Sequence, residues 1–387
     1  MKIRIYSRYV LLGLSLALML QTNYRIAGSV GIGELLAIVY FVLVGARQAL
    51  VGGQVQIRRP DDFTLFYSAV VVLVITPMTL LSLGMNTQGS SFRDLISYFF
   101  TCAVLLVLPR ADRDVHTMVM TFLVVLFATI GFQFFWGDSS AYYFLRFTGG
   151  AKNPNQLALF LVVAVAFSAC LPSATYRIGV VLLSLFFGIA SSSDAYLVFV
   201  LVSILGFTTL IVLPPRAVVF ALPLLLVMTY IAFISTGISE VLVQEWAVAD
   251  EGDLRTQLWL FAFQAWIDSP LSFVFGHGAG SFSGIAGPFG MAEAHNTILD
   301  LATVGGTFGL LLFPALPLWM IVKSLSKNHR FAPAVFMGLI AYACFHFVGR
   351  QPVFWVSIVL LSRLILAEWD RKRLASNAKP IINGASA

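Results

Sequence analysis

Apolar runs of membrane-spanning length recur along the whole chain and leave no room for a water-soluble domain. The sequence is 59% hydrophobic and 11% charged, whereas soluble domains carry about 25% charged residues. The runs lie near residues 9–22, 30–45, 63–83, 94–108, 115–136, 155–171, 177–190, 195–213, 217–235, 298–322, 332–348 and 353–367. We therefore expect an all-α, polytopic transmembrane helical bundle with about twelve spans.

The distribution of basic residues predicts how these spans are oriented. Threading the chain through a bilayer places 18 of the 24 Lys and Arg residues on one side and 6 on the other. Because Lys and Arg concentrate in cytoplasmic loops, the richer side and both termini are predicted to be cytoplasmic. The net charge of +6 thus concerns orientation and not nucleic-acid binding. The six outer cations are Arg25, Arg93, Arg146, Lys152, Arg255 and Arg350.

The same threading divides the chain into four parts. We expect an N-terminal transmembrane bundle of about nine spans over 1–235, and one large outer loop over 236–297. About three C-terminal spans over 298–373 and a flexible cytoplasmic tail over 374–387 follow. The first span follows Lys2, Arg4 and Arg8 and has no small-residue cleavage site after it, so we interpret it as a retained anchor.

The large outer loop contains a helical pattern followed by many glycines. Leu254, Leu258, Phe261 and Ala265 recur at helical spacing, which predicts an amphipathic helix on the outer membrane surface. Pro270 is expected to end this helix. The glycine-rich stretch over 276–280 then favours a close-packed turn that brings backbone amides near a ligand.

His295 stands at the end of this loop, where the chain re-enters an apolar run. Histidine has an unperturbed pKa near neutrality and can take and return a proton. A carboxylate two residues upstream, Glu293, could orient the ring. The alternative is that His295 only caps or packs the following helix. His277 is a second candidate, but its Gly-His-Gly setting favours a role in backbone shape.

The outer-face cations are candidates for binding an anion. An arginine side chain presents a fixed fork of donors that suits phosphate oxygens, and it stays charged. The alternative for each is an interfacial cation paired with lipid headgroups. The strongest candidates by position are Arg255, which opens the helical pattern, then Arg146, Lys152 and Arg350.

A metal site is not expected. The cysteines Cys102, Cys170 and Cys344 each fall inside an apolar run without CxxC spacing, which is typical of small core residues. His277, Glu293 and His295 lack the spacing of a zinc site.

Taken together, these segments resemble the C-terminal region of the O-antigen ligase and polymerase family, multispanning inner-membrane proteins of bacterial surface-polysaccharide assembly. No single piece is specific, but their order and spacing together are. The matching pieces are 149–158, 255–259, Ser269-Pro270, 276–282, and His295-Asn296 followed after nine residues by Gly306 and Gly309.

The resemblance implies an enzyme that needs no cofactor and acts at the periplasmic face of the inner membrane. The donor would be a glycan on undecaprenyl diphosphate, and the acceptor a hydroxyl of the lipid A core. His295 would be the general base, and Arg255 would bind the diphosphate and stabilise the leaving group. The further residues implied in binding the diphosphate or glycan are Arg146, Lys152, Asn153, Asn155, Asn296 and Arg350.

The chain departs from the family pattern in one Ser-rich turn. Family members often carry a basic residue there, whereas the turn over 191–194 ends in Asp194. An acid repels a diphosphate, so we expect Asp194 to cap the following helix. Arg146 or Arg350 is expected to replace the missing charge.

Three other functions compete with a ligase. A repeat-unit polymerase uses the same donor but a second lipid-linked repeat as acceptor. A lipid-linked glycan flippase would place polar residues at mid-membrane, often in repeated halves, and neither feature is evident here. A metal-dependent oligosaccharyltransferase would need clustered carboxylates on the outer face as metal ligands, and the short outer loop after the first span, 23–29, contains none.

Overall fold

The computed structural model describes residues 7–27, 30–50, 61–84, 91–109, 111–137, 141–143, 145–212, 251–280, 294–312 and 330–377. Within these ranges the protein is all-α, apart from two short antiparallel hairpins. The helices before the large loop are α1 (Ser7–Leu18), α2 (Ile32–Leu50), α3 (Asp62–Val70), the π-helical η1 (Val71–Ile75), α4 (Thr76–Gly84), α5 (Ser91–Leu106), α6 (Asp112–Trp136), α7 (Pro154–Ser168), α8 (Ala174–Ser191) and α9 (Asp194–Val212). The later helices are α12 (Glu251–Ile267), α13 (Pro270–Phe275), α15 (Thr297–Leu311), α17 (Phe331–Phe345) and α18 (Pro352–Asn377). The strands are β1 (Arg25–Ala27), β2 (Val30–Gly31), β3 (Tyr142–Tyr143) and β4 (Arg146–Phe147).

Four helical stretches in the described part of the chain are long and apolar enough to cross a membrane. They are Asp62–Leu83, Asp112–Trp136, Ala174–Ser191 and Asp194–Val212, the first of which runs through α3, η1 and α4. The other predicted apolar runs are also helical where they are described, but these helices are shorter or less apolar. The run over 217–235 lies outside the described residues, so the count of twelve spans stays a prediction.

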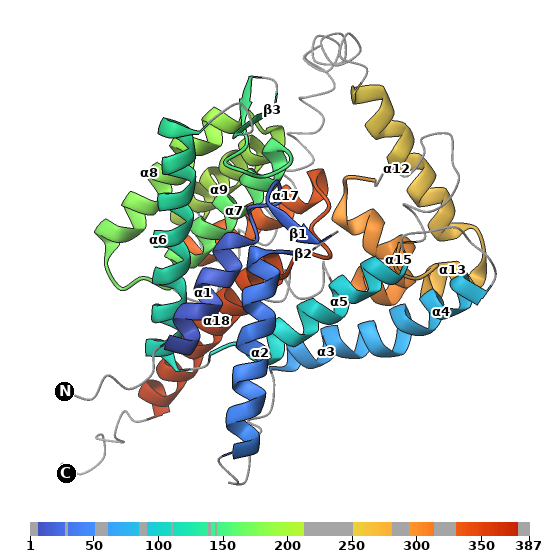
Figure 1. Ribbon diagram of the computed structural model, residues 1–387, viewed down its shortest axis with the longest axis horizontal. Coiled ribbons are helices and arrows are strands. Elements are labelled where there is room, and N and C mark those ends of the chain that lie inside the picture. The colour runs from blue at the N-terminus through green and yellow to red at the C-terminus, as the bar shows by residue number, and fades with distance from the viewer. Residues whose placement is uncertain are drawn as a thin grey trace, which may run out of the picture.

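The core is built around α7, which packs against α6, α8, α9, α17 and α18. From Leu157 to Ser168 every residue of this helix is buried, as expected for a helix that is apolar on all sides. Phe122 of α6 lies against it, with its ring 4.7 Å from that of Phe167 and 6.3 Å from that of Phe160. In Figure 1, α6, α8 and α9 form the left part of the molecule, and α12, α13 and α15 the right part.

Helix ends that the sequence assigns to the cytoplasm lie toward one end of the view in Figure 1. The start of α1, the end of α2, the start of α6 and the end of α18 all lie toward the bottom, while β3 lies at the top.

A group of polar contacts joins helices at their predicted cytoplasmic ends. Arg363 of α18 donates to both carboxylate oxygens of Asp61, at 3.1 and 2.7 Å, and to the carbonyl of Pro109 at 2.5 Å.

A break at Gly306 shapes α15 and the glycine-rich stretch that crosses it. Gly306 has φ +58° and ψ −146°, a conformation open to glycine but strained for other residues. A Cβ there would lie 2.4 Å from the backbone of Val274, and a Cβ on Gly276 would lie 2.5 Å from that of Val304. The two segments therefore touch backbone to backbone. His277 and Gly278 donate their amides to the carbonyls of Thr303 and Val304.

The predicted helix ends before Pro270, at Ile267, as expected. The sequence did not lead us to expect a second helix there, but Pro270 opens α13 as its first residue. Ser269 caps α13 through a reciprocal pair of hydrogen bonds with Ser272, and proline suits the first helical position because no helical partner is needed for its missing N–H.

Helix α12 is present as predicted, but its apolar residues are not confined to one face. Leu258, which belongs to the predicted set, and Ala262, which does not, are buried where α12 packs against α15, while Phe261 and Ala265 of the predicted set are only partly buried. Leu260, Phe263 and Ile267, on other faces, are exposed. A helix that is apolar on its exposed side as well fits contact with lipid better than contact with water on that side.

Candidate functional site

A cavity of about 500 Å³ lies where several separate segments of the chain begin or end. Its walls come from the turn after α1 with β1 and β2, the first turns of α2, α5 and α7, the turn before α15, and the turn between α17 and α18. The sequence assigns every one of these ends to the outer face. The cavity therefore joins segments far apart in the chain at one end of the bundle.

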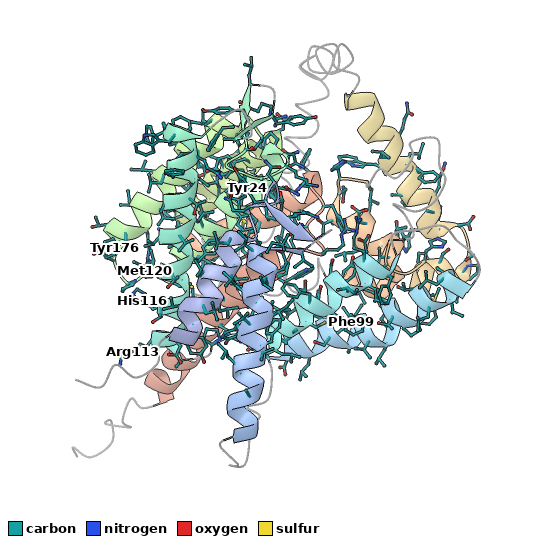
Figure 2. All side chains as sticks on the ribbon, in the orientation of Figure 1. Tyr24, Phe99, Arg113, His116, Met120 and Tyr176 are labelled. Carbon is teal, nitrogen blue, oxygen red and sulfur yellow. The ribbon has the colours of Figure 1, made fainter. Side chains whose placement is uncertain are left out.

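Four of the six cations predicted on the outer face line this cavity. They are Arg25, Arg93, Lys152 and Arg350. Glu34 and Asp94 add two carboxylates, so with neutral histidines the formal charge of the lining is +2. Figure 2 shows Tyr24, the neighbour of Arg25, near the middle of the molecule, far in the view from Arg113 on α6.

Sequence reasoning missed Arg25 and Arg93 as site residues, although it placed both on the outer face. The signal that finds them is the same one that drew attention to Lys152 and Arg350. Each is a cation on the predicted outer face, where the positive-inside rule leads one to expect few Lys and Arg residues.

Arg350 is held in a defined position by its neighbours. Its guanidinium forms an ion pair with the carboxylate of Asp94, which is 4% exposed. The guanidinium carbon lies 4.8 Å from the centre of the Phe347 ring, a cation–π contact. The backbone carbonyl of Arg350 accepts a hydrogen bond from Thr101 of α5 at 3.3 Å. Asp94 also lies 3.4 Å from Nε of Arg93, so one buried carboxylate contacts two arginines of the site.

A buried pair of glutamines seats the loop that carries Lys152. Nε2 of Gln133 donates to Oε1 of Gln21 at 2.8 Å, and Nε2 of Gln21 donates to the carbonyl of Gly149 at 3.1 Å. Gly150, at φ +83°, packs directly against both amides, with a Cβ position only 2.3 Å from Oε1 of Gln21. A side chain at Gly150 would displace this network.

The turn after α1 fixes the backbone of Lys152 from the other side. Thr22 accepts a hydrogen bond from the amide of Lys152 at 2.9 Å and donates to the side chain of Gln156 at 2.9 Å. Asn23 donates its side-chain amide to the carbonyl of Ala151 at 3.0 Å. The loop therefore presents Lys152 from a backbone tied to α1, α6 and α7.

The two asparagines predicted next to Lys152 have different environments. Asn153 lines the cavity and also caps α7, accepting a hydrogen bond from the amide of Gln156 at 2.9 Å. Asn155 does not line the cavity. Its side chain accepts from Ser193 at 2.7 Å, and its carbonyl accepts from Tyr342 at 2.6 Å, so it joins α7 to α9 and α17.

His295 lines the cavity in a strained backbone conformation. It is one of two residues other than glycine with positive φ in the described part, at +51°. Such outliers cost about 1–3 kcal/mol and cluster at functional sites. The ring of His346 lies nearly parallel to that of His295, at 17° and 6.1 Å between centroids. His346 is buried, lines the same cavity and was not predicted, because it lies inside an apolar run.

Hydrogen bonds from one threonine join the backbones of the two histidine turns. The hydroxyl of Thr297 donates to the carbonyl of His346 at 2.6 Å and accepts from the amide of Val348 at 2.9 Å. Asn296 caps α15 by accepting from the amides of Ile298 and Leu299. Among the described contacts Asn296 therefore positions the start of α15, directly after His295.

Arg146 reaches the Ser-rich turn where the family pattern has a cation. Its guanidinium donates to the carbonyls of Ser191 and Ser192, at 3.2 and 2.6 Å, and so satisfies the end of α8. It does not line the cavity, whereas Arg350, the other candidate for this charge, does. The expectation that Asp194 caps α9 is off by one position: Asp194 is the first residue of the helix, where an acid interacts favourably with the helix dipole.

Other predicted groups lie elsewhere or outside the described residues. The side chain of Arg255 and the whole of Glu293 are outside them. His277 pairs through Nε2 with the carbonyl of Ala265 at 2.7 Å. The amides of His277, Gly278 and Ala279 are used by protein acceptors, so this stretch serves packing between helices.

Among the described residues, no group of three or more His, Cys, Asp or Glu side chains is placed to hold a metal ion. Comparison with protein-family models and with curated proteins finds no match for this chain.

Proposed function

We propose that this protein is an integral membrane glycosyltransferase of the bacterial inner membrane. It transfers a glycan from an undecaprenyl-diphosphate carrier to an acceptor hydroxyl, in the manner of an O-antigen ligase. The observation that carries the proposal is the convergence of four cationic side chains and His295 on one cavity. The resemblance of the ordered motifs to the ligase and polymerase family supplies the substrate class. Both termini are cytoplasmic in this proposal, and the cavity is periplasmic.

The charge of the cavity supports a diphosphate as its ligand. A diphosphate that links a lipid to a glycan carries two negative charges, and the lining has a formal charge of +2. Arg350, fixed by Asp94 and Phe347, presents a planar fork of donors that suits phosphate oxygens. Lys152 adds a point charge from the loop tied to α1. Arg255 is expected to join them from α12.

The chemistry follows from these positions. The acceptor oxygen attacks the anomeric carbon, while the bond from that carbon to the diphosphate oxygen breaks and its electron pair leaves with the diphosphate. The acceptor proton passes to an imidazole nitrogen of His295, a step typically worth about 10²–10⁴ in rate. The cations stabilise the charge that develops on the leaving diphosphate. The ring of His346 lies nearly parallel to that of His295, with centroids 6.1 Å apart, and in this proposal it helps to orient the base.

A repeat-unit polymerase would use the same donor site with another lipid-linked repeat as acceptor. Deletion in the native host separates the functions, through analysis of lipopolysaccharide and secreted polysaccharide. Loss of capped lipopolysaccharide with polymer still on its carrier means a ligase, and single-repeat products mean a polymerase. Glycan trapped on its carrier inside the cell means a flippase and contradicts the proposal.

Complementation of the deletion with single variants tests the site itself. His295→Gln keeps a polar side chain without the proton chemistry and is expected to abolish transfer at normal protein level. His116→Gln is the matched control, because His116, labelled in Figure 2, lies on α6 and does not line the cavity. Arg93→Gln is expected to reduce transfer, with Arg113→Gln of α6 as its control. Full transfer by His295→Gln would refute the assignment of the general base.

A further inference from the structure

The walls of the cavity change from polar to apolar along three helices. On α2 the cavity touches Glu34 and then Ile38, and on α7 it touches Gln156 and then Phe160. The change occurs at a spacing of four residues, which places each apolar side chain on the same face about one turn further along its helix. On α5 the lining runs over about two turns, from Arg93 and Asp94 through Ile96 and Ser97 to Phe100. A charged compartment at the helix starts therefore continues into an apolar one.

This apolar compartment is closed on one side and open on the other. On the α7 side, Leu159 and Phe160 are 2% and 3% exposed, so that wall belongs to the core. On the opposite side, Ile38 of α2 and Ile96 of α5 both line the cavity and are 45% and 52% exposed. The cavity therefore reaches the protein surface between α2 and α5 through apolar side chains.

An aromatic contact bounds this opening further along the two helices. The rings of Phe41 of α2 and Phe100 of α5 meet edge to face, with centroids 5.9 Å apart. Phe41 follows Ile38 by three residues and Phe100 follows Ile96 by four, so the contact lies about one turn beyond the opening. The outer surfaces of both helices are apolar nearby, with Val39 and Phe99 also exposed; Figure 2 labels Phe99 on α5.

We propose that the opening between Ile38 and Ile96 is the passage through which the polyprenyl tail of the lipid diphosphate leaves the cavity for the membrane. The proposal rests on the proposed function, which places the diphosphate among the cations. The tail is the occupant because the apolar compartment is continuous with the anion compartment. A ligand anchored by its diphosphate at Arg350 and Lys152 has its first isoprene units beside Phe160, Ile38 and Ile96.

Binding of two probes to the purified full chain separates the tail passage from the anion site. The probes are inorganic pyrophosphate, which has only the anionic group, and farnesyl diphosphate, which adds a short polyprenyl tail. A ligand that binds only the folded chain stabilises it by RT ln(1 + [L]/Kd), so both affinities are read from the rise of the unfolding midpoint with ligand concentration. Wild-type protein is expected to bind farnesyl diphosphate at least about tenfold more tightly than pyrophosphate, because the tail buries several methylene groups.

Ile38→Trp and Ile96→Trp fill the opening with a larger side chain. Each variant is expected to lower the affinity for farnesyl diphosphate about tenfold and to leave the affinity for pyrophosphate within about twofold of wild type. Val39→Trp is the matched control, because Val39 neighbours Ile38 and is similarly exposed but does not line the cavity. Equal effects of Ile38→Trp and Val39→Trp, or no effect of either opening variant, would overturn the passage. Failure of the wild type to bind either probe would instead overturn the proposed function.

A labelling experiment on the wild-type chain avoids any dependence on how the tryptophan variants fold. A farnesyl diphosphate with a photoreactive diazirine on its tail is activated in the presence of the protein, and labelled peptides are mapped. Labels are expected on α2 and α5 around Ile38 and Ile96, and excess pyrophosphate is expected to suppress them. Labels confined to other helices, or labels that pyrophosphate does not suppress, would mean that the tail enters elsewhere or binds as ordinary membrane lipid.

Discussion

Replacing Asp94 by asparagine is expected to lower the stability of the protein and to raise its affinity for pyrophosphate. The carboxylate is 4% exposed and pairs with Arg350, whose side chain is 18% exposed. Breaking a buried ion pair from one side costs about 3–5 kcal/mol, because the remaining charge stays in a low-dielectric site. Asparagine keeps a hydrogen-bond acceptor toward Arg350, so we expect a loss at or below about 3 kcal/mol.

Two opposed effects decide the change in affinity. Without the carboxylate, the Arg350 side chain is less ordered before the ligand binds, and ordering it on binding costs free energy. The rotamer entropy of arginine limits this cost to about 2 kcal/mol. The Phe347 ring still holds the guanidinium, at 4.8 Å, so only part of this cost applies. Removing a negative charge about 6 Å from the bound anion gains about 1.4–2.8 kcal/mol at an effective dielectric constant of about 40 to 20. The charge effect is larger, so affinity should rise about threefold to thirtyfold.

Thermal unfolding of purified protein, titrated with pyrophosphate, measures both quantities at once. Asp94→Asn should unfold at a lower temperature than wild type without ligand and gain more from added pyrophosphate. Arg350→Gln is the comparison, since it should weaken binding. High salt should shrink the difference between Asp94→Asn and wild type, because screening reduces the charge term. If Asp94→Asn weakened pyrophosphate as much as Arg350→Gln, the carboxylate would be a positioning group and the charge reasoning would be refuted.

Three further predictions concern the elements around the cavity. Gly306→Ala should lower the unfolding midpoint by several degrees, since its Cβ would meet the backbone of α13 at 2.4 Å, whereas Gly131→Ala, with nothing within 4 Å, should be neutral or slightly stabilising. Asn296→Ala should cost about 1 kcal/mol of stability measured by denaturant unfolding, and Asn296→Asp should restore most of it, because aspartate also caps a helix start. Arg146→Gln should reduce thermal stability but leave pyrophosphate affinity within about twofold, while Lys152→Gln should weaken pyrophosphate by about fivefold to tenfold; the reverse pattern in titrations would show that Arg146 belongs to the anion site.

The helices could be predicted because their signal is local. An apolar run has few alternatives to a helix, and every predicted run that is described contains one. The end of α12 before Pro270 was predicted, whereas the helix that Pro270 opens was not. Proline both ends a preceding helix and suits the first turn of the next, and the Ser269–Ser272 capping pair marks the start of α13. That pair is a local signal that the sequence carries.

The composition of the site was only partly predictable because its contacts are long-range. The charge asymmetry between the two sides of the membrane identified six cations on the outer face, and four of them line the cavity. The partner of Arg350 is Asp94, which lies on a helix far away in the chain, and no spacing rule links the two. His346 was hidden for the opposite reason, because its neighbours are apolar and only packing brings its ring to His295.

The two carboxylates explain how the four cations stand together before any ligand arrives. Two like charges about 6–8 Å apart would repel by about 2–3 kcal/mol at an effective dielectric constant of about 20, so cations that line one cavity are stabilised by nearby carboxylates. Asp94, in contact with both Arg93 and Arg350, reduces this repulsion, and Glu34 adds a second counter-charge in the same cavity. The remaining formal charge of +2 matches a diphosphate diester and exceeds that of a phosphodiester headgroup. Under the proposed function, we expect charge balance to favour the diphosphate carrier over phospholipid headgroups with one charge, because a ligand with one charge leaves the lining unbalanced.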